Sequence, residues 1–152
     1  MSINHMNLQR NKSLKNHTTI KVGGESEYFS EPLNISELVK QLHWAKHNNY
    51  KYRIIGAGSN LLIKDKRLEG LTICTKKLKS IFINPKSGSS SAECGVMLPT
   101  LSNLLSKNGC EGGEWIIGIP GTIGGAIFMN AGSGDYSISN NLISVEAIDM
   151  KP

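Results

Sequence analysis

Two glycine-rich segments constrain this chain more than any other feature of its sequence. Residues 109–134 contain nine of the 16 glycines in the 152-residue chain. A shorter segment, Gly56-Ala57-Gly58-Ser59-Asn60, directly follows the apolar run Tyr52–Ile55. Glycine lets the backbone approach a ligand closely, and successive N–H groups can then form an anion-binding concavity. The pattern predicts a globular protein in which backbone loops make much of the binding site.

The segment around Gly56 and Gly58 begins like the dinucleotide-binding pattern G-x-G-x-x-G. However, Leu61 occupies the third glycine position, and Leu61–Ile63 is predicted to be extended rather than helical. The pattern requires a helix at that point, so a Rossmann fold is excluded. An anion-binding loop and an ordinary tight turn both remain open for this segment.

The second segment has glycines spaced by three, at Gly118, Gly121 and Gly124, with Gly125 adjacent. Pro120-Gly121 favours a type II turn. Thr122 is predicted at a helix N-terminus, where its hydroxyl and free N–H groups favour phosphate. Two such loops, about sixty residues apart in the chain, suit a ligand with a pyrophosphate bridge, although a structural turn remains the alternative.

Apolar periodicity and capping residues predict a mixture of helices and short strands. A helix should begin after Asn34, with Glu37 three residues on as in a capping box, and end at Asn48-Asn49. The remaining predictions are a polar tail over 1–15, strands at 52–55, 71–74, 78–83 and 143–147, extended structure at 92–95, a turn at 85–91, a helix from Pro99 to Gly109 and a short helix at 126–129.

The charge of +5 is unevenly distributed, with +9 over residues 1–86 and −4 over residues 87–152. Such a surplus fits an anionic ligand, whereas aromatic residues at 6% leave few stacking platforms for nucleic acid. Three cysteines without a C-x-x-C pair indicate a reducing compartment. The polar N-terminus lacks a secretory signal and no apolar run is long enough to span a membrane, so a soluble, cytoplasmic protein is expected.

Other candidate chemistry in the sequence is weaker. His43 and His47 are four residues apart, but Trp44 stands where the zinc-protease motif needs glutamate, so both are expected to be solvated. His17 has no obvious partner, and Cys74, Cys94 and Cys110 are expected to be small buried side chains. Glu111 and Glu114 beside Gly112-Gly113 are expected in a solvated loop, with a position near a site as the alternative. No metal site is predicted.

Four motifs in series resemble one enzyme family. They are HTTIKVGG at 17–24, IGAGSNLL at 55–62, GIPGTIGGA at 118–126 and MNAG at 129–132. Their order and spacing resemble the UDP-N-acetylenolpyruvoylglucosamine reductases, the MurB family of bacterial peptidoglycan synthesis. The resemblance extends over about Asn16 to Asp149, nearly the whole chain.

The resemblance implies an α+β flavoprotein with the FAD-binding fold of vanillyl-alcohol oxidase and p-cresol methylhydroxylase. Two small lobes would hold FAD between them. The expected organisation is a flexible tail over 1–15, a first lobe over 16–75 and an incomplete second lobe over 76–152. The substrate-binding domain of the family would be absent.

The resemblance also implies the residues that contact FAD. The first loop would contact the pyrophosphate, and the second loop with the MNAG segment would line the diphosphate and the isoalloxazine ring. These positions are Gly56, Ala57, Gly58, Ser59, Asn60, Leu61, Gly118, Ile119, Pro120, Gly121, Thr122, Gly124, Gly125, Asn130, Ala131 and Gly132. The family's catalytic serine, glutamate and arginine come after Pro152, so no catalytic residue is predicted here.

In this family NADPH reduces FAD, and the flavin passes hydride to the enolpyruvyl group of a UDP-sugar. One alternative is a flavin subunit of a molybdenum hydroxylase with the same fold, which would not be expected to show the Thr19–Gly24 motif. Another is a flavin-binding module without catalytic activity. A nucleic-acid-binding domain is the least favoured alternative, and the oligomeric state is left open.

Overall fold

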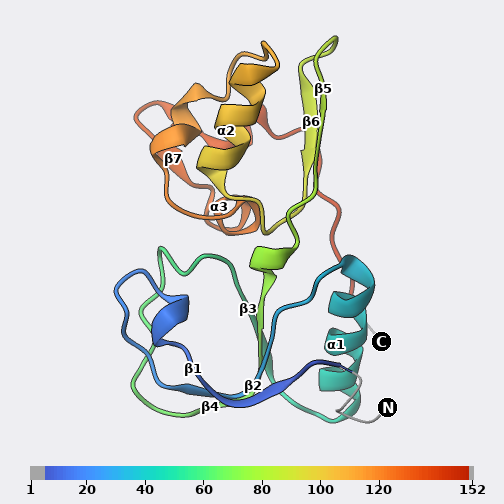
Figure 1. Ribbon diagram of the computed structural model, residues 1–152, viewed down its shortest axis with the longest axis vertical. Coiled ribbons are helices and arrows are strands. Elements are labelled where there is room, and N and C mark those ends of the chain that lie inside the picture. The colour runs from blue at the N-terminus through green and yellow to red at the C-terminus, as the bar shows by residue number, and fades with distance from the viewer. Residues whose placement is uncertain (1–5, 151–152) are drawn as a thin grey trace.

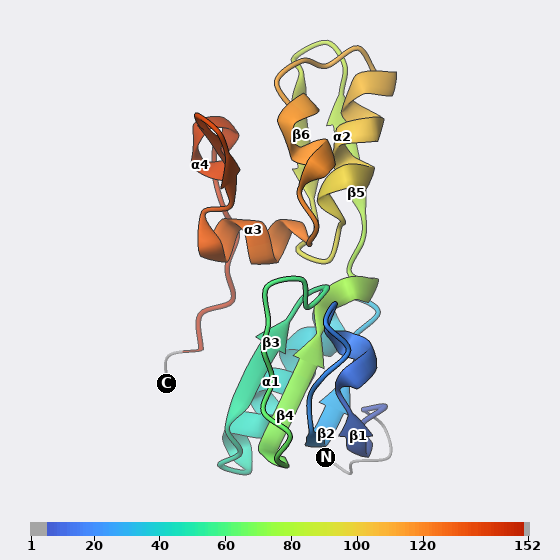
Figure 2. The ribbon, with the colours of Figure 1, turned by 90° about the vertical axis from the view of Figure 1, so that its left-hand side faces the viewer.

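The computed structural model describes residues 6–150, and its elements gather in two bodies (Figures 1 and 2). The first body contains β1 (Gln9–Ser13), η2 (Lys15–His17), β2 (Glu25–Ser30), α1 (Ile35–His47), β3 (Tyr52–Ile55) and β4 (Leu68–Cys74). After η3 (Thr75–Lys77), the second body contains β5 (Ile81–Asn84), β6 (Ser89–Ala92), α2 (Leu98–Lys107), η4 (Glu114–Gly118), α3 (Ile123–Met129), β7 (Gly132–Ser133), β8 (Tyr136–Ser137) and α4 (Ile138–Asn141).

The sheet of the first body has the strand order β1-β2-β4-β3. β1 is antiparallel to β2, whereas β4 is parallel to both β2 and β3. Ser30 pairs with Ile73, and Ile55 pairs with Cys74. The carboxyl ends of three parallel strands, β2, β4 and β3, therefore lie side by side, and we call this end of the sheet its carboxyl edge. This carboxyl edge faces the second body in Figure 2.

Helix α1 covers one face of the sheet, as its sequence pattern predicts. The Asn34 side chain accepts a hydrogen bond of 2.9 Å from the Glu37 N–H and caps the first turn. The apolar stripe of α1 packs against alternate residues of β2 and β4, forming a core that includes Leu38, Leu42, Ala45, Tyr28, Leu71 and Ile73. On the opposite face of the sheet, Phe29, Leu14, Ile55 and Cys74 form a separate cluster. Neighbouring residues of a strand point to opposite faces, so one strand serves both cores.

The second body has a core of its own between α2, η4 and α3. Pro99 lies in the first turn of α2, as predicted, because its missing N–H has no helical partner there. The apolar side chains of α2 and α3 then meet in a cluster of buried residues: Val96, Leu98, Leu101, Leu105, Cys110, Ile116, Ile123 and Ala126. Among residues 6–150, no helix is long and apolar enough to cross a membrane.

The N-terminal segment differs from the flexible tail that the sequence predicts over 1–15. Gln9–Ser13 forms β1 at the edge of the sheet, and the Leu14 side chain is fully buried. β1 is hard to predict from sequence because its side chains are polar and mostly exposed. Backbone pairing with β2, rather than burial of apolar side chains, makes this segment a strand. Residues 1–5 of the predicted tail lie outside the described residues.

Three further stretches depart from the sequence predictions. Ser89–Ser91, predicted in a turn, belong to β6, which pairs with β5. Neither 61–63 nor 143–147 forms a strand, so the alternation of Ile143, Val145 and Ala147 does not reflect a pairing. Instead, Ile148 and Met150 pack against the core beneath α1, and the C-terminal segment thus returns to the first body.

Candidate functional site

The first glycine loop, residues 56–61, begins where β3 ends at the carboxyl edge of the sheet. Gly58 has φ +74°, and a Cβ there would collide with the His17 carbonyl oxygen. The Thr19 N–H donates a 3.1 Å hydrogen bond to the Gly58 carbonyl. The His17–Thr19 segment therefore holds this loop from one side, and only glycine fits at its closest approach.

The N–H groups of this loop have no hydrogen-bond partners among the described residues. Within residues 6–150, no hydrogen bond uses the backbone N–H of Ala57, Gly58, Ser59 or Asn60. The loop's carbonyls are engaged instead: Gly58 accepts from Thr19, and the Cys74 thiol lies 3.6 Å from the Gly56 carbonyl oxygen. Four successive unpaired donors on a glycine-rich turn are suited to an anion.

The second glycine loop, residues 118–125, lies directly against the first. The Ser59 hydroxyl donates a 2.9 Å hydrogen bond to the Pro120 carbonyl. A Cβ on Gly56 would collide with the Thr122 hydroxyl, and a Cβ on Gly121 would lie 3.1 Å from the Ser59 oxygen. The structure thus brings the two loops together, although about sixty residues separate them in the chain.

Thr122 caps α3, as predicted, but the expectation of free N–H groups at this helix N-terminus is wrong. The N–H groups of Ile123 and Gly124 donate 2.8 Å hydrogen bonds to the carbonyls of Val96 and Cys94. The Gly125 N–H donates to the Thr122 hydroxyl at 3.4 Å. The N–H groups of Gly121 and Thr122, by contrast, have no hydrogen-bond partner among the described residues. Both loops therefore offer unpaired donors where they meet, and the second loop also supports the first.

The MNAG positions lie apart from the two loops, beyond the other end of α3 (Figure 2). A helix of seven residues is about 10 Å long. Asn130 ends α3 in the left-handed conformation, with φ 44°, and Gly132 pairs with Ser137 in the β7–β8 hairpin. Gly118, at the start of the second loop, is exposed, and a Cβ added to it would meet no atom within 4 Å. The 118 position and the MNAG positions therefore lie at the margins of the paired loops.

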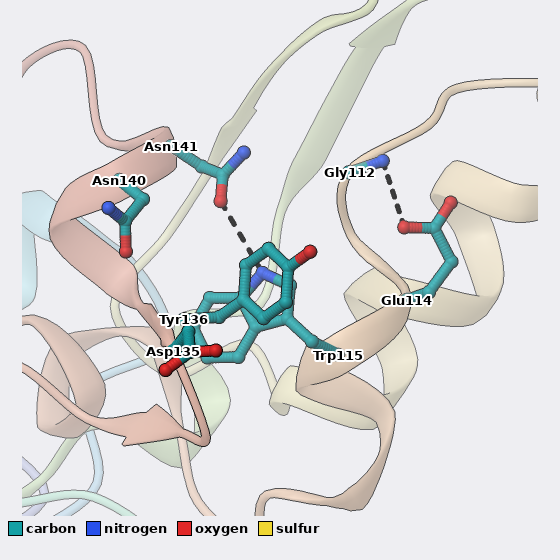
Figure 3. A pocket seen from close by; sticks show the side chains of 7 residues that line it. All are labelled: Gly112, Glu114, Trp115, Asp135, Tyr136, Asn140 and Asn141. Atoms are coloured by element: carbon teal, nitrogen blue, oxygen red, sulfur yellow. Dashed lines mark hydrogen bonds between the residues drawn. The ribbon is translucent and has the colours of Figure 1, made fainter.

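A separate open pocket of about 590 Å³ lies beside the β7–β8 hairpin (Figure 3). The Trp115 and Tyr136 rings stack at its centre, 6.2 Å apart, and the Trp115 indole donates to the Asn141 side chain. Glu114 lines this pocket and accepts from the Gly112 N–H. None of the predicted FAD-contacting residues lines it.

The residues that the site prediction missed are His17 and Thr19, which hold the first loop. Their signal is the HTTIKVGG motif itself, which indicates the family but does not by itself show which loop it contacts. His17 lies against Phe29, with ring centroids 4.5 Å apart. Burial lowers the pKa of His17 and raises the pKa of the Cys74 thiol. His43 and His47 are exposed, in agreement with the prediction.

The fold and the paired loops agree with the family to which the sequence belongs, a class of flavoprotein domain. A family model described as an FAD binding domain matches residues 26–151, and the chain belongs to that family. The fold is the α+β fold of the vanillyl-alcohol oxidase type, as predicted. A solved Phl p 4 variant, described as a glucose oxidase, shares it with a TM-score of 0.56 at 11% identity, covering 66% of this chain and 24% of that chain.

Within this class, the chain is similar in sequence and in structure to reductases. It is 60% identical over 91% of its length to a UDP-N-acetylenolpyruvoylglucosamine reductase of Prochlorococcus marinus subsp. pastoris, and covers 47% of that protein. The crystal structure of the enzyme of this name (MurB) from Thermus caldophilus has a TM-score of 0.58 at 30% identity, covering 86% of this chain and 44% of that chain. These matches confirm the resemblance predicted from the motifs. The chain spans about half the length of the relatives it matches.

Proposed function

We propose that this chain binds FAD, with the pyrophosphate on the N–H groups of the first glycine loop. The observation that carries this proposal is the set of unpaired donors from Ala57 to Asn60. The second loop would keep the first in place through the hydrogen bond from Ser59 to Pro120. Lys12 and Lys76 lie near enough to His17 to help lower its pKa, so two cationic side chains lie close to this edge. A cradle of backbone donors with adjacent cations fits an anionic cofactor.

We infer that the bound flavin serves an NADPH-dependent reductase that converts a UDP-N-acetylglucosamine enolpyruvyl ether to UDP-N-acetylmuramate in peptidoglycan synthesis. The names of the relatives support this inference. When bound, the flavin supplies the hydride chemistry. The residues of this chain would bind and orient the cofactor and keep its pyrophosphate from water. The three free cysteines support a cytoplasmic location.

The first experiment is a flavin titration of the purified chain, followed by absorbance and by quenching of flavin fluorescence. We expect one FAD per chain, retained through desalting. A chain that is folded by circular dichroism and binds no FAD would contradict the proposal.

A pair of serine variants locates the site. Ser59→Ala removes the hydrogen bond between the loops and should weaken FAD binding about 2- to 10-fold, the usual net value of one such bond. Ser36→Ala changes an exposed serine of α1 and serves as the matched control, with unchanged affinity. Equal affinities for the two variants would show that the hydrogen bond between the loops does not support FAD binding.

Reduction of the bound flavin by NADPH tests the second inference. Anaerobic bleaching by NADPH, and reoxidation by the enolpyruvyl UDP-sugar, would support the reductase. A chain that binds FAD but is not bleached would instead act as a flavin-binding module.

A further inference from the structure

Three metal-ligating side chains meet beneath the first glycine loop. They come from three parts of the first body: His17 from the end of η2, Glu31 from the position directly after β2, and Cys74 from the end of β4. One ligand atom from each lies within 4.8 Å of the other two. In the sequence these residues are far apart, and parallel strand pairing brings two of them to the same edge.

The three side chains match what zinc takes in proteins: imidazole nitrogen, carboxylate oxygen and thiolate sulfur. At bond lengths of about 2.0–2.3 Å, tetrahedral ligand atoms lie about 3.5 Å apart. The cluster therefore needs to contract by at most about 1 Å to close around the ion. Within the described residues, neither imidazole nitrogen of His17 takes part in a hydrogen bond, and burial lowers the pKa of His17 toward the neutral ring that a metal requires. The same burial raises the pKa of the Cys74 thiol, so the metal has to displace its proton.

The charges around the cluster both favour and oppose a cation. A carboxylate and a thiolate would neutralise a divalent ion, and the thiol proton would be released to solvent. Lys77 opposes this, because its ammonium lies 3.7 Å from the Glu31 carboxylate and competes for it. Both partners of this ion pair are partly exposed, with relative side-chain exposures of 48% for Lys77 and 25% for Glu31. Breaking the pair therefore costs little free energy.

We propose that His17, Glu31 and Cys74 bind a zinc ion, with a fourth position open to water. Two ligands also touch the loop above them: the His17 carbonyl packs on Gly58, and the Cys74 thiol faces the Gly56 carbonyl. The ion would thus tie both sides of the first glycine loop to the sheet edge. Its binding is measured without flavin, so the result is independent of the proposed function.

Cobalt(II) is the probe, because a thiolate ligand produces a sulfur-to-cobalt charge-transfer band in the near ultraviolet. The chelator-treated chain is titrated anaerobically with cobalt in the presence of a phosphine reductant. We expect one cobalt per chain, the charge-transfer band, the visible bands of a four-coordinate ion, and displacement by zinc. The absence of the charge-transfer band with cobalt in excess would overturn the proposal.

Matched variants identify the ligands. Cys74→Ala should abolish the charge-transfer band, whereas Cys110→Ala, at a buried cysteine in the second body, should retain it. His17→Gln should weaken cobalt binding by more than about tenfold, whereas His43→Gln at an exposed histidine should not. Persistence of the band in Cys74→Ala would overturn the site. If Cys74→Ala does not fold, His17→Gln and Glu31→Gln decide the question through the same titration.

Lys77→Gln provides a variant with the opposite expected effect. Removing the competing ammonium should tighten cobalt binding, because Glu31 is then free to turn to the metal. If the positive charge of Lys77 acted only through general electrostatics, removing the charge of exposed Lys79 would change the cobalt affinity by the same amount. Lys79→Gln is therefore the control. Equal effects of the two lysine variants would count against Glu31 as a ligand.

Discussion

At the scale of single residues, Gly58 is subject to two independent constraints. Its φ of +74° disfavours any L side chain, and a Cβ would collide with the His17 carbonyl. Gly88 has nearly the same φ, +69°, but no atom lies within 4 Å of its Cβ position. The two glycines therefore separate the cost of the backbone conformation from the cost of the collision.

We predict that Gly58→Ala lowers stability by more than Gly88→Ala does. The unfavourable φ alone should cost about 1 kcal/mol or more in each variant, and the collision adds to this at Gly58. Gly58→Ala should also weaken FAD binding, because the loop must move away from His17. Denaturant unfolding and flavin titration measure the two effects. Equal losses of stability in both variants would show that the loop moves away from the His17 carbonyl without a cost in stability.

The glycines predicted where the two loops lie, because a positive φ such as that of Gly58 or Gly121 is a local property of the backbone. The sequence could not show which N–H groups stay free. That depends on whether Cys94 and Val96 lie beside α3, and their carbonyls do accept from Gly124 and Ile123. The donors of Ile123–Gly125 are therefore occupied, whereas those of Gly121, Thr122 and Ala57–Asn60 have no partner among the described residues.

At the scale of elements, α3 depends on a cap that also touches the first loop. Thr122 is almost fully buried, and its hydroxyl accepts from the Gly125 N–H while lying against Gly56. We predict that Thr122→Ala costs about 1 kcal/mol of unfolding free energy and that Thr122→Ser recovers most of it. Thermal unfolding with and without FAD measures both. A serine variant no better than alanine would assign the loss to the methyl group rather than to the cap.

The helices were predictable because their signals are local. Asn34, Glu37 and the apolar stripe of α1 lie within one segment, as do Pro99 and the leucines of α2. The missed strands have no such signal. β1 and β6 are polar, and pairing with β2 and β5 makes them strands. Conversely, the alternating residues 143–147 have no partner strand among the described residues and stay irregular.

At the scale of the whole molecule, the C-terminal segment connects the two bodies for a second time. Ile148 and Met150 pack against the first core, and the Lys46 ammonium donates a 2.7 Å hydrogen bond to the Met150 carbonyl. The first crossing of the chain runs through η3 in Figure 2. The last described residues of the second lobe predicted from sequence, 76–152, therefore pack on the first lobe, 16–75.

We predict that Ile148→Ser destabilises the first body by about 1 kcal/mol, because a half-buried apolar side chain is lost from its core. Val145→Ser is the control, since Val145 is 53% exposed and its replacement should change stability by less than about 0.5 kcal/mol. Trp44 fluorescence in a Trp115→Phe background reports unfolding of the first body alone. Similar values for the two variants would show that the segment does not dock.

The contact between Gly56 and Thr122 also has a consequence for synthesis on the ribosome. At about 5–20 residues per second, the nascent chain carries the first loop for several seconds before the second loop is made. During that time Gly56 and Ser59 have no partner from the second loop. The contact between the two loops can therefore form only after residues 118–125 have been made, when the first sheet has already been synthesised.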